Sequence, residues 1–231
     1  SGVLFKFTPS SDGLELILAA TDSYRLAEKI VSVNAGASTN IKEPVNVIVP
    51  SRTVAELIRI LGVFKDSLEN PEEIQINLGE NQILFSYDTV ELISRTIEGK
   101  YPDYRQLIPE RFETEVVVSK DELSRAVKTA SLFSRTGLND IHLTFTPPST
   151  VRLAATNTQT GEHAVDLDGA IQGKTNSITV NFRYFLDGVN NIESENVILQ
   201  LIDGMSPCLI RGYGDGQSMK EYLYIVMPIR Q

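Results

Sequence analysis

The chain has 231 residues, enough for one large domain or two ordinary ones, and 42% of them are hydrophobic, which suits a protein with a packed core. No stretch approaches the roughly 20 apolar residues of a membrane-spanning helix, and no secretory leader is visible. The single cysteine, Cys208, cannot form an internal disulfide and favours a cytoplasmic location. A net charge of −9 argues against nucleic acid binding unless basic residues gather in particular elements, because phosphate contacts need Lys and Arg.

The first half of the chain alternates hydrophobic and polar residues over short stretches, which predicts seven strands separated by turn signals such as Gly79-Glu80-Asn81. One helix is expected at Arg52–Phe64, where hydrophobic residues recur at helical spacing. The expected strands are Leu4–Thr8, Leu14–Ala20, Arg25–Val33, Val45–Val49, Glu73–Leu78, Gln82–Tyr87 and Val90–Ile97.

The second half predicts eight further strands and two helices, at Lys120–Ser134 and Phe182–Ile192. Ser119 followed by Glu122 is typical of a capping box, and Asn181 is typical of an N-cap residue. The expected strands are Thr114–Val118, His142–Thr146, Thr150–Ala155, Glu162–Leu167, Ser177–Val180, Asn196–Ile202, Cys208–Gly212 and Lys220–Met227.

An internal repeat relates the two halves. The tetrapeptide Leu-Ala-Ala-Thr occurs at Leu18–Thr21 and again at Leu153–Thr156. At a similar offset, Val47–Pro50 and Ser177–Val180 each precede a predicted helix. A long repeat of this kind indicates two copies of one domain. The second copy has the order βαβββ twice, whereas the first copy lacks the opening strand and helix.

These elements predict an α+β fold of repeated βαβββ units, with helices on one face of antiparallel sheets. The two domains are expected at residues 1–111 and 112–231, with the boundary in the Pro109–Thr114 stretch. Ser1 is not a natural start, so the sequence is interpreted as a piece of a longer protein. A domain that lacks a strand and a helix is expected to expose an unpaired sheet edge, and therefore to self-associate or to lose stability.

Several short motifs appear in the same order and at compatible spacings in one known family. They are Ala20-Thr-Asp-Ser-Tyr-Arg-Leu26, Val49-Pro50, Tyr101-Pro-Asp-Tyr104 with Pro109, Asn181 with Tyr184, and Val226-Met-Pro-Ile-Arg230. Through these motifs, essentially the whole chain resembles the second and third domains of the bacterial β sliding clamp, the processivity subunit of the replicative DNA polymerase III holoenzyme.

The resemblance implies the DNA-clamp fold and, for the complete protein, a head-to-tail homodimeric ring that slides on duplex DNA without sequence preference. Helices would line the central hole, and sheets would form the outer wall. The ring would tether replicative and repair polymerases and the clamp loader through short peptides of the Gln-Leu-x-Leu-Phe type. The resemblance implies no catalysis and no cofactor.

The resemblance also implies a hydrophobic pocket for partner peptides between the two domains. Leu, Met, Pro and Ile side chains would form an adaptable apolar wall, and Asn181, Arg25 and Arg230 would orient the peptide. Met205 and Met227 have the alternative interpretation of plain core filling. The implied pocket residues are Thr21, Tyr24, Arg25, Leu26, Pro102, Gln106, Leu107, Leu138, Asn181, Tyr184, Met205, Pro207, Ile225, Met227, Pro228, Ile229 and Arg230.

The predicted helices are less acidic than the rest of the chain. The helical segments Ser51–Asp66 and Ser119–Arg135 have net charges of +1 and +2, and Asn181–Glu193 has −1. A sliding ring needs weak, sequence-blind phosphate contacts rather than base recognition. We therefore expect a DNA-facing set on the helices, with an ordinary solvated surface as the alternative. The candidates are Arg52, Arg59, Lys120, Arg125 and Lys128.

Two other classes of protein remain open. His142 lies near Ser134 and Asp140, which leaves a Ser-His-Asp hydrolase as an alternative, although a triad is defined by geometry rather than sequence proximity. No nucleophile elbow, phosphate-binding loop or zinc-ligand spacing is present. The other alternative is a non-catalytic β-rich binding module unconnected with DNA. No metal is expected, but aspartates in Gly-rich turns leave a calcium site open. These aspartates are Asp12, Asp203 and Asp215.

Overall fold

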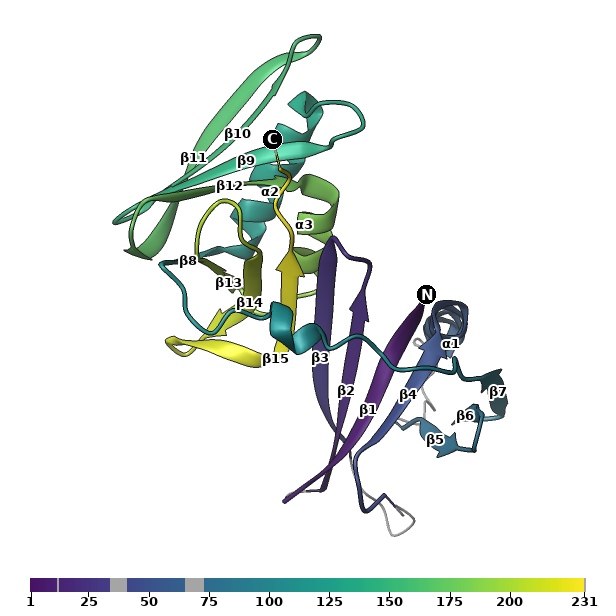
Figure 1. The fold of residues 1–231 in the computed structure, drawn as a ribbon. Helices are drawn as coiled ribbons and strands as arrows, with labels where there is room; N and C mark the ends of the chain where they lie inside the picture. Colours follow the sequence, from purple (N-terminus) through teal and green to yellow (C-terminus); the bar gives the residue numbers. More distant parts are fainter. Residues whose placement is uncertain (12, 34–40, 65–72, 231) are drawn as a thin grey trace. The chain divides into compact units, whose positions relative to one another are not determined.

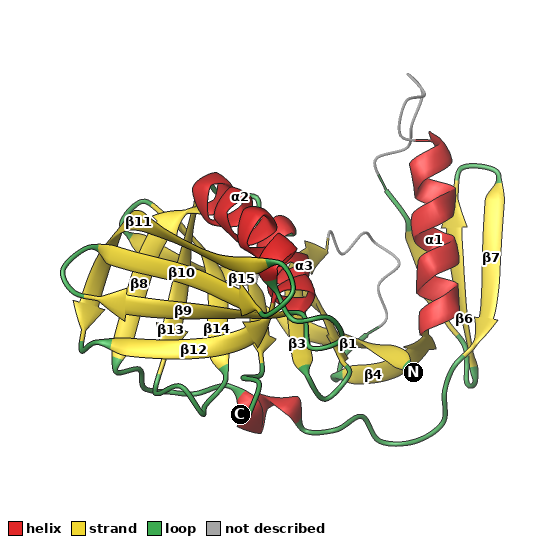
Figure 2. Ribbon diagram, turned by 90° about the horizontal axis from the view of Figure 1, so that it is seen from above, coloured by secondary structure: helices red, strands yellow, loops and turns green. Residues whose placement is uncertain are grey.

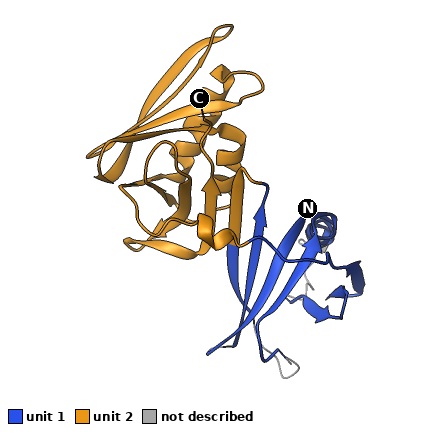
Figure 3. Cartoon of the chain, in the orientation of Figure 1, with its two compact units in different colours: residues 1–22, 29–102 blue, residues 23–28, 103–231 orange. Residues whose placement is uncertain are grey.

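The computed structural model describes residues 1–11, 13–33, 41–64 and 73–230. The chain divides into two compact units (Figure 3). Unit 1 comprises Ser1–Asp22 and Lys29–Pro102, and unit 2 comprises Ser23–Glu28 and Asp103–Gln231. Among the helices in the described ranges, none is long and apolar enough to cross a membrane.

Unit 1 contains two antiparallel sheets and one helix (Figure 1). The strands of the first sheet that lie in unit 1 have the order β3-β2-β1-β4, and the second sheet has the order β5-β6-β7. Leu57 of the helix joins residues of both sheets, including Phe5 and Phe85, in one buried cluster, so the helix and the two sheets share a core. The elements are β1 (Gly2–Ser10), β2 (Gly13–Thr21), β3 (Arg25–Val33), β4 (Val45–Pro50), α1 (Ser51–Phe64), β5 (Gln75–Leu78), β6 (Gln82–Tyr87) and β7 (Val90–Arg95).

Unit 2 contains the first residues of β3 and eight complete strands in the order β12-β9-β10-β11-β8-β13-β14-β15, with α2 and α3 packed side by side (Figure 2). Its core is a single cluster of buried aliphatic and aromatic side chains from both helices and the strands. The elements are η1 (Tyr104–Leu107), β8 (Thr114–Ser119), α2 (Lys120–Ala130), η2 (Ser131–Phe133), β9 (Asp140–Thr146), β10 (Thr150–Asn157), β11 (Gly161–Gly173), β12 (Asn176–Asn181), α3 (Phe182–Asn190), β13 (Asn196–Leu201), β14 (Cys208–Gly214) and β15 (Gln217–Val226).

The strand order confirms the internal repeat and the α+β fold of βαβββ units. In unit 1 the order is β4-β1-β2-β3, and in unit 2 the corresponding strands have the order β12-β9-β10-β11. The two Leu-Ala-Ala-Thr segments lie in corresponding strands, the first at the end of β2 and the second near the end of β10. Within unit 2, the first strand of each βαβββ half pairs with the other half, because β8 pairs with β13 and β12 pairs with β9.

Both predicted helix caps are present. The Asn181 Oδ1 atom accepts hydrogen bonds from the backbone N–H groups of Arg183 (3.0 Å) and Tyr184 (3.3 Å), so it satisfies two of the donors that a helix start leaves free. The Ser119 Oγ atom accepts one from Glu122 N at 3.4 Å. These contacts fix where α3 and α2 begin.

Most predicted elements end within one or two residues of the predicted position, and two end further away. The helix expected to run to Ser134 stops at Ala130 and continues as a short 3₁₀ helix, where the hydroxyl groups of Ser131 and Ser134 donate to backbone carbonyls three residues earlier. Such local bonds compete with helical ones. Strand β11 runs to Gly173, beyond the predicted end at Leu167, because its last part pairs with β8. A Cβ atom at Gly169 would lie 2.9 Å from the Val117 carbonyl oxygen, so this close pairing requires glycine.

Candidate functional site

Unit 2 contains an open, largely apolar cavity of about 790 Å³. It is formed by segments that are far apart in the sequence: the residues just before β3, the loop before β9, the start of α3, the loop between β13 and β14, and the segment that follows β15. The lining residues are Ser23, Tyr24, Gly137, Leu138, Asn181, Tyr184, Met205, Pro207, Met227, Pro228, Ile229 and Arg230.

Backbone hydrogen bonds hold the segment after β15 along the cavity. The N–H of Met227 donates to the carbonyl oxygen of Tyr24, and the N–H of Ile229 donates to that of Thr179, each at 2.8 Å. Pro228 lies between them and has no N–H to satisfy. The segment is therefore tied on both sides of the proline, which fixes two apolar side chains at the cavity wall.

The loops that carry Leu138 and Met205 are also fixed by hydrogen bonds. The Leu138 carbonyl oxygen accepts from Asn181 Nδ2 at 3.3 Å. The Asp203 carboxylate accepts from the N–H groups of Met205 (2.9 Å) and Ser206 (2.8 Å). Hydrogen bonds from the Ser206 side chain and from these N–H groups lower the pKa of Asp203, so the carboxylate acts as a loop cap. The position of the Asp203 carboxylate in a Gly-containing turn is thus accounted for by its hydrogen bonds within the loop.

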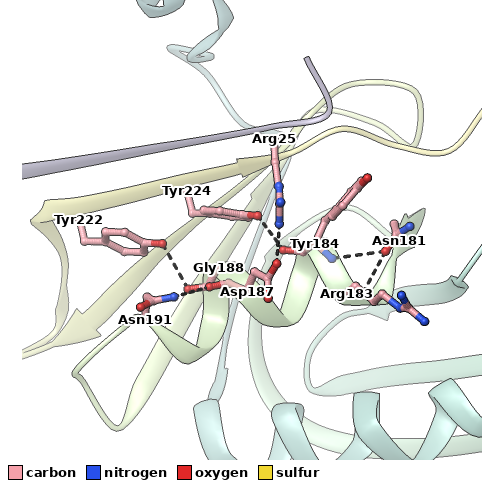
Figure 4. A network of polar contacts seen from close by, with 9 residues as sticks. All are labelled: Arg25, Asn181, Arg183, Tyr184, Asp187, Gly188, Asn191, Tyr222 and Tyr224. Atoms are coloured by element: carbon pink, nitrogen blue, oxygen red, sulfur yellow. Dashed lines mark hydrogen bonds and ion pairs between the residues drawn. The ribbon is translucent and has the colours of Figure 1, made fainter. Parts of the chain in front are cut away.

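Aromatic residues form another part of the cavity wall. The rings of Tyr24 and Tyr184 stack with centroids 6.1 Å apart. The Arg25 guanidinium lies 4.4 Å from the centre of the Tyr184 ring and donates to the Asp187 carboxylate at 2.5 Å (Figure 4). The Tyr224 hydroxyl donates to the Tyr184 carbonyl oxygen at 2.7 Å. Tyr184 is therefore contacted through both its ring and its backbone.

The structure brings ten of the sequence-predicted pocket residues to the cavity wall and places the other seven elsewhere. Leu26 and Ile225 are almost fully buried, and neither lines the cavity. Gln106 and Leu107 lie in η1 and Arg25 begins β3, all in unit 2, whereas Thr21 and Pro102 belong to unit 1. The ten lining residues are Tyr24, Leu138, Asn181, Tyr184, Met205, Pro207, Met227, Pro228, Ile229 and Arg230.

Sequence reasoning omitted two lining residues, Ser23 and Gly137. Both have a left-handed backbone conformation, with φ angles of 73° and 88°. Glycine adopts this conformation readily, but serine does so rarely, so the backbone conformation at Ser23 could not be predicted from the residue type. No turn was predicted at Gly137, although the resemblance placed its neighbour Leu138 in the pocket. Asp187, which forms an ion pair with Arg25 and does not line the cavity, was omitted as well.

The basic candidates on the helices fall into two groups. The Arg59 guanidinium donates twice to the Glu56 carboxylate on α1, and the Lys120 ammonium donates to the Ile192 carbonyl oxygen at 2.9 Å. Within the described ranges, Arg52, Arg125 and Lys128 form no ion pair. Lys120, Arg125 and Lys128 border one shallow recess of about 280 Å³ on α2. The recess gathers three cations on one surface of unit 2.

The residues considered for catalysis do not form a triad in the described part of the chain. Asp140 accepts from Arg135, with the shortest contact at 2.5 Å, and His142 Nδ1 lies 2.9 Å from Thr179 Oγ1. The Ser134 hydroxyl donates to the Ser131 carbonyl oxygen at 2.8 Å. Among the described residues, no group of three or more His, Cys, Asp or Glu side chains could hold a metal ion, and Asp12 lies outside these residues.

Two family descriptions together match almost the entire chain. Residues 1–103 match the DNA polymerase III beta subunit, central domain, and residues 105–230 match its C-terminal domain. The chain is 31% identical over 217 residues to the beta sliding clamp of Staphylococcus aureus strain Mu50, a match that covers 94% of this chain and 54% of the relative. It is 29% identical over the same length to the beta sliding clamp of Staphylococcus epidermidis.

Solved structures give the same result. The crystal structure of the DNA polymerase sliding clamp from Bacillus subtilis has a TM-score of 0.86 and 28% sequence identity, covering all of this chain and 56% of that one. The clamp from Pseudomonas aeruginosa bound to griselimycin has a TM-score of 0.85 and 25% identity, covering all of this chain and 57% of that one.

This protein belongs to the DNA polymerase III beta subunit family, whose curated relatives carry the name beta sliding clamp. Family membership favours a clamp over the two alternatives, a hydrolase and a β-rich module unconnected with DNA. The chain spans about half the length of the curated relatives that it matches.

Proposed function

We propose that this chain is part of a ring-forming sliding clamp, a DNA polymerase processivity factor without catalytic activity of its own. Residues 1–111 form the second clamp domain, and residues 112–231 form the third. The complete protein is a head-to-tail homodimer that encircles duplex DNA in the cytoplasm, and polymerases and the clamp loader dock on it through short peptides. The observation that carries the proposal is the apolar cavity of unit 2 in a chain of this family.

The chemistry of the cavity suits a short peptide with Leu and Phe side chains. Its volume of about 790 Å³ lies within the range of ligand pockets, roughly 300–1,000 Å³. Met205 and Met227 supply polarizable side chains that adapt to the shape of a ligand. Asn181 uses its side-chain oxygen for the cap and one N–H of its NH₂ group for Leu138, which leaves the second N–H to donate to a ligand. The exposed Arg230 offers several N–H donors, so it is the side chain best suited to bind the peptide main chain or the oxygen of its Gln.

Titration with a fluorescein-labelled Gln-Leu-Ser-Leu-Phe peptide, followed by fluorescence polarization, tests the docking site. We expect saturable binding that Met205→Ala and Met227→Ala each weaken. The matched control is Met219→Ala, because Met219 is also partly exposed but lies on β15 outside the cavity. Absence of saturable binding, or an equal loss in all three variants, would contradict the proposal.

The exposed cations of α2 support the proposal that this helix faces DNA. Arg125 and Lys128 are both exposed and border the same recess. Cations so placed give weak phosphate contacts that do not read sequence and depend on salt, which is what sliding requires. Asp121 and Glu122 at the start of α2 limit the strength of this field.

The test uses the complete protein loaded on nicked circular DNA. We expect retention that is lost when the circle is linearised, and a lower salt concentration for release in Arg125→Glu and Lys128→Glu. Lys220→Glu on β15 reverses a charge at an exposed position away from α2 and serves as the control. Retention on linear DNA would argue against encirclement, and equal salt sensitivity in all variants would argue against α2 as the DNA-facing surface.

A further inference from the structure

The orientation of the Tyr184 ring is set by two neighbours from the segment just before and at the start of β3. Tyr24 stacks on this ring, with an angle of 28° between the planes. The Arg25 guanidinium also lies over the ring, 4.4 Å from its centre, which is within the range of a cation–π contact. Because Tyr24 and Tyr184 both line the cavity, the position of Arg25 affects the shape of its aromatic wall.

Asp187 forms an ion pair with Arg25 in this position. It lies one turn after Tyr184 on α3, on the same side of the helix, and its Oδ2 atom accepts from Arg25 Nη1 at 2.5 Å (Figure 4). The Asp187 carbonyl oxygen accepts from Asn191 Nδ2 at 2.7 Å, which adds a second contact within the last turn of α3. A free arginine side chain samples many rotamers, so an ion pair at its tip restricts the guanidinium to the ring.

We propose that Asp187 is a positioning residue for the cavity: by holding Arg25 over the Tyr184 ring, it keeps the Tyr24–Tyr184 wall in the orientation that receives a ligand. This inference rests on the proposed peptide-docking function. Asp187 itself touches no ligand, because it does not line the cavity. The Asp187 side chain is 62% exposed and that of Arg25 is 31% exposed, so the substitution Asp187→Asn leaves no fully buried charge and is compatible with folding.

Peptide titration of four chains tests the inference: the natural chain, Asp187→Asn, Arg25→Ala and the double variant. We expect Asp187→Asn to weaken binding about two- to fivefold, the range of an exposed cation–π contact. In the Arg25→Ala background, Asp187→Asn should cause no further loss, because the residue through which it acts is gone. A merely structural role of Asp187 in α3 would cause the same loss in both backgrounds, and that result would overturn the inference.

Asp166→Asn is the matched control, since Asp166 also forms an exposed ion pair in unit 2, with Arg152 on β10, away from the cavity. Its binding should equal that of the natural chain. A second measurement does not depend on the peptide: the ¹⁹F resonance of Tyr184 in protein labelled with 3-fluorotyrosine, assigned by Tyr184→Phe. It should shift in Asp187→Asn and not in Asp166→Asn.

The outcomes separate the two proposals. If the natural chain binds no peptide, the docking function fails, and the ¹⁹F shift still decides whether Asp187 positions the ring. If the natural chain binds and Met205→Ala weakens binding but Asp187→Asn does not, only the positioning role is overturned. An unchanged Tyr184 resonance in Asp187→Asn also overturns it.

Discussion

Gly188 on α3 packs directly against the ring of Tyr224 on β15. A Cβ atom added at position 188 would lie 2.2 Å from Tyr224 Cδ1, far inside any real contact distance. The helix backbone therefore lies so close to the Tyr224 ring that no side chain fits at position 188. This approach also brings the Tyr224 hydroxyl within hydrogen-bonding distance of the Tyr184 carbonyl oxygen.

Replacing this glycine should destabilise the protein even though alanine favours helices. We expect Gly188→Ala to lower the free energy of unfolding by about 1–3 kcal/mol, because overpacking outweighs the gain in helix propensity. Gly62→Ala is the matched control, since a Cβ atom there meets nothing within 4 Å. Gly62 is also helical, so that variant should gain about 0.5–1 kcal/mol. Urea denaturation measures both, and a stabilised Gly188→Ala would contradict the packing.

Removing the Tyr224 hydroxyl should leave the Tyr184 carbonyl without this donor. We expect Tyr224→Phe to cost about 1 kcal/mol of stability, the usual contribution of one hydrogen bond. Tyr213→Phe is the control, because the Tyr213 hydroxyl has no hydrogen-bond partner among the described residues and its ring is only partly buried. Equal losses in the two variants would mean that the loss does not come from this hydrogen bond.

Two substitutions of Asn181, the N-cap residue of α3, distinguish the role of its side-chain oxygen from that of its NH₂ group. Asn181→Ala should lower stability by about 1 kcal/mol, since two backbone N–H groups lose their acceptor. Asn181→Asp keeps the acceptor and should restore most of this loss, although it removes the donor to Leu138. Thermal unfolding followed by circular dichroism compares the three chains. An aspartate variant as unstable as the alanine variant would assign the main role to the Leu138 contact.

Cys208 should be inert in the native protein. Its side chain is buried, and burial raises the pKa of its thiol to about 12, so almost no thiolate is present at neutral pH. Ellman's reagent should label this thiol only after unfolding, at a rate that follows the denaturant concentration. Rapid labelling under native conditions would contradict the burial of β14 at this position.

The Arg135–Asp140 pair predicts a change of stability in acid. Burial opposes ionisation of Asp140, but hydrogen bonds from the Arg135 side chain and backbone outweigh it and lower the pKa of the carboxyl group. The contribution of this pair is therefore complete above the unfolded pKa of about 4 and is lost as the pH falls through the lower native value. Asp140→Asn should lose less stability than the natural chain below about pH 4. Urea denaturation of the two chains at neutral pH and below about pH 4 measures this difference.

The helices and strands could be predicted because their signals are local. Phe182, Phe185 and Val189 recur at helical spacing after the capping Asn181, and all of α3 follows from this pattern. The end of α2 could not be predicted, because serine hydroxyl groups bind the backbone there instead of continuing the helix. The extension of β11 depends on pairing with β8, which lies about 50 residues earlier in the chain.

The cavity could not be derived from local patterns. Tyr24 and Met227 lie about 200 residues apart, and only the resemblance to a known family placed them in one pocket; the structure now joins them by a backbone hydrogen bond. Leu26 and Ile225 show the limit of this approach. Each lies two residues from a lining residue, but Tyr24 and Met227 lie just outside β3 and β15, whereas Leu26 and Ile225 lie within these strands and are buried.

The exchange of first strands between the two halves of unit 2 affects how this unit unfolds. Strand β8 of the first half forms backbone hydrogen bonds with β13 of the second half, and β12 of the second half forms them with β9 of the first half. Neither half can open without breaking backbone hydrogen bonds that hold the other. The amide protons of β8, β9, β12 and β13 should therefore exchange with solvent in one common event, which makes the two-fold repeated unit a single cooperative block.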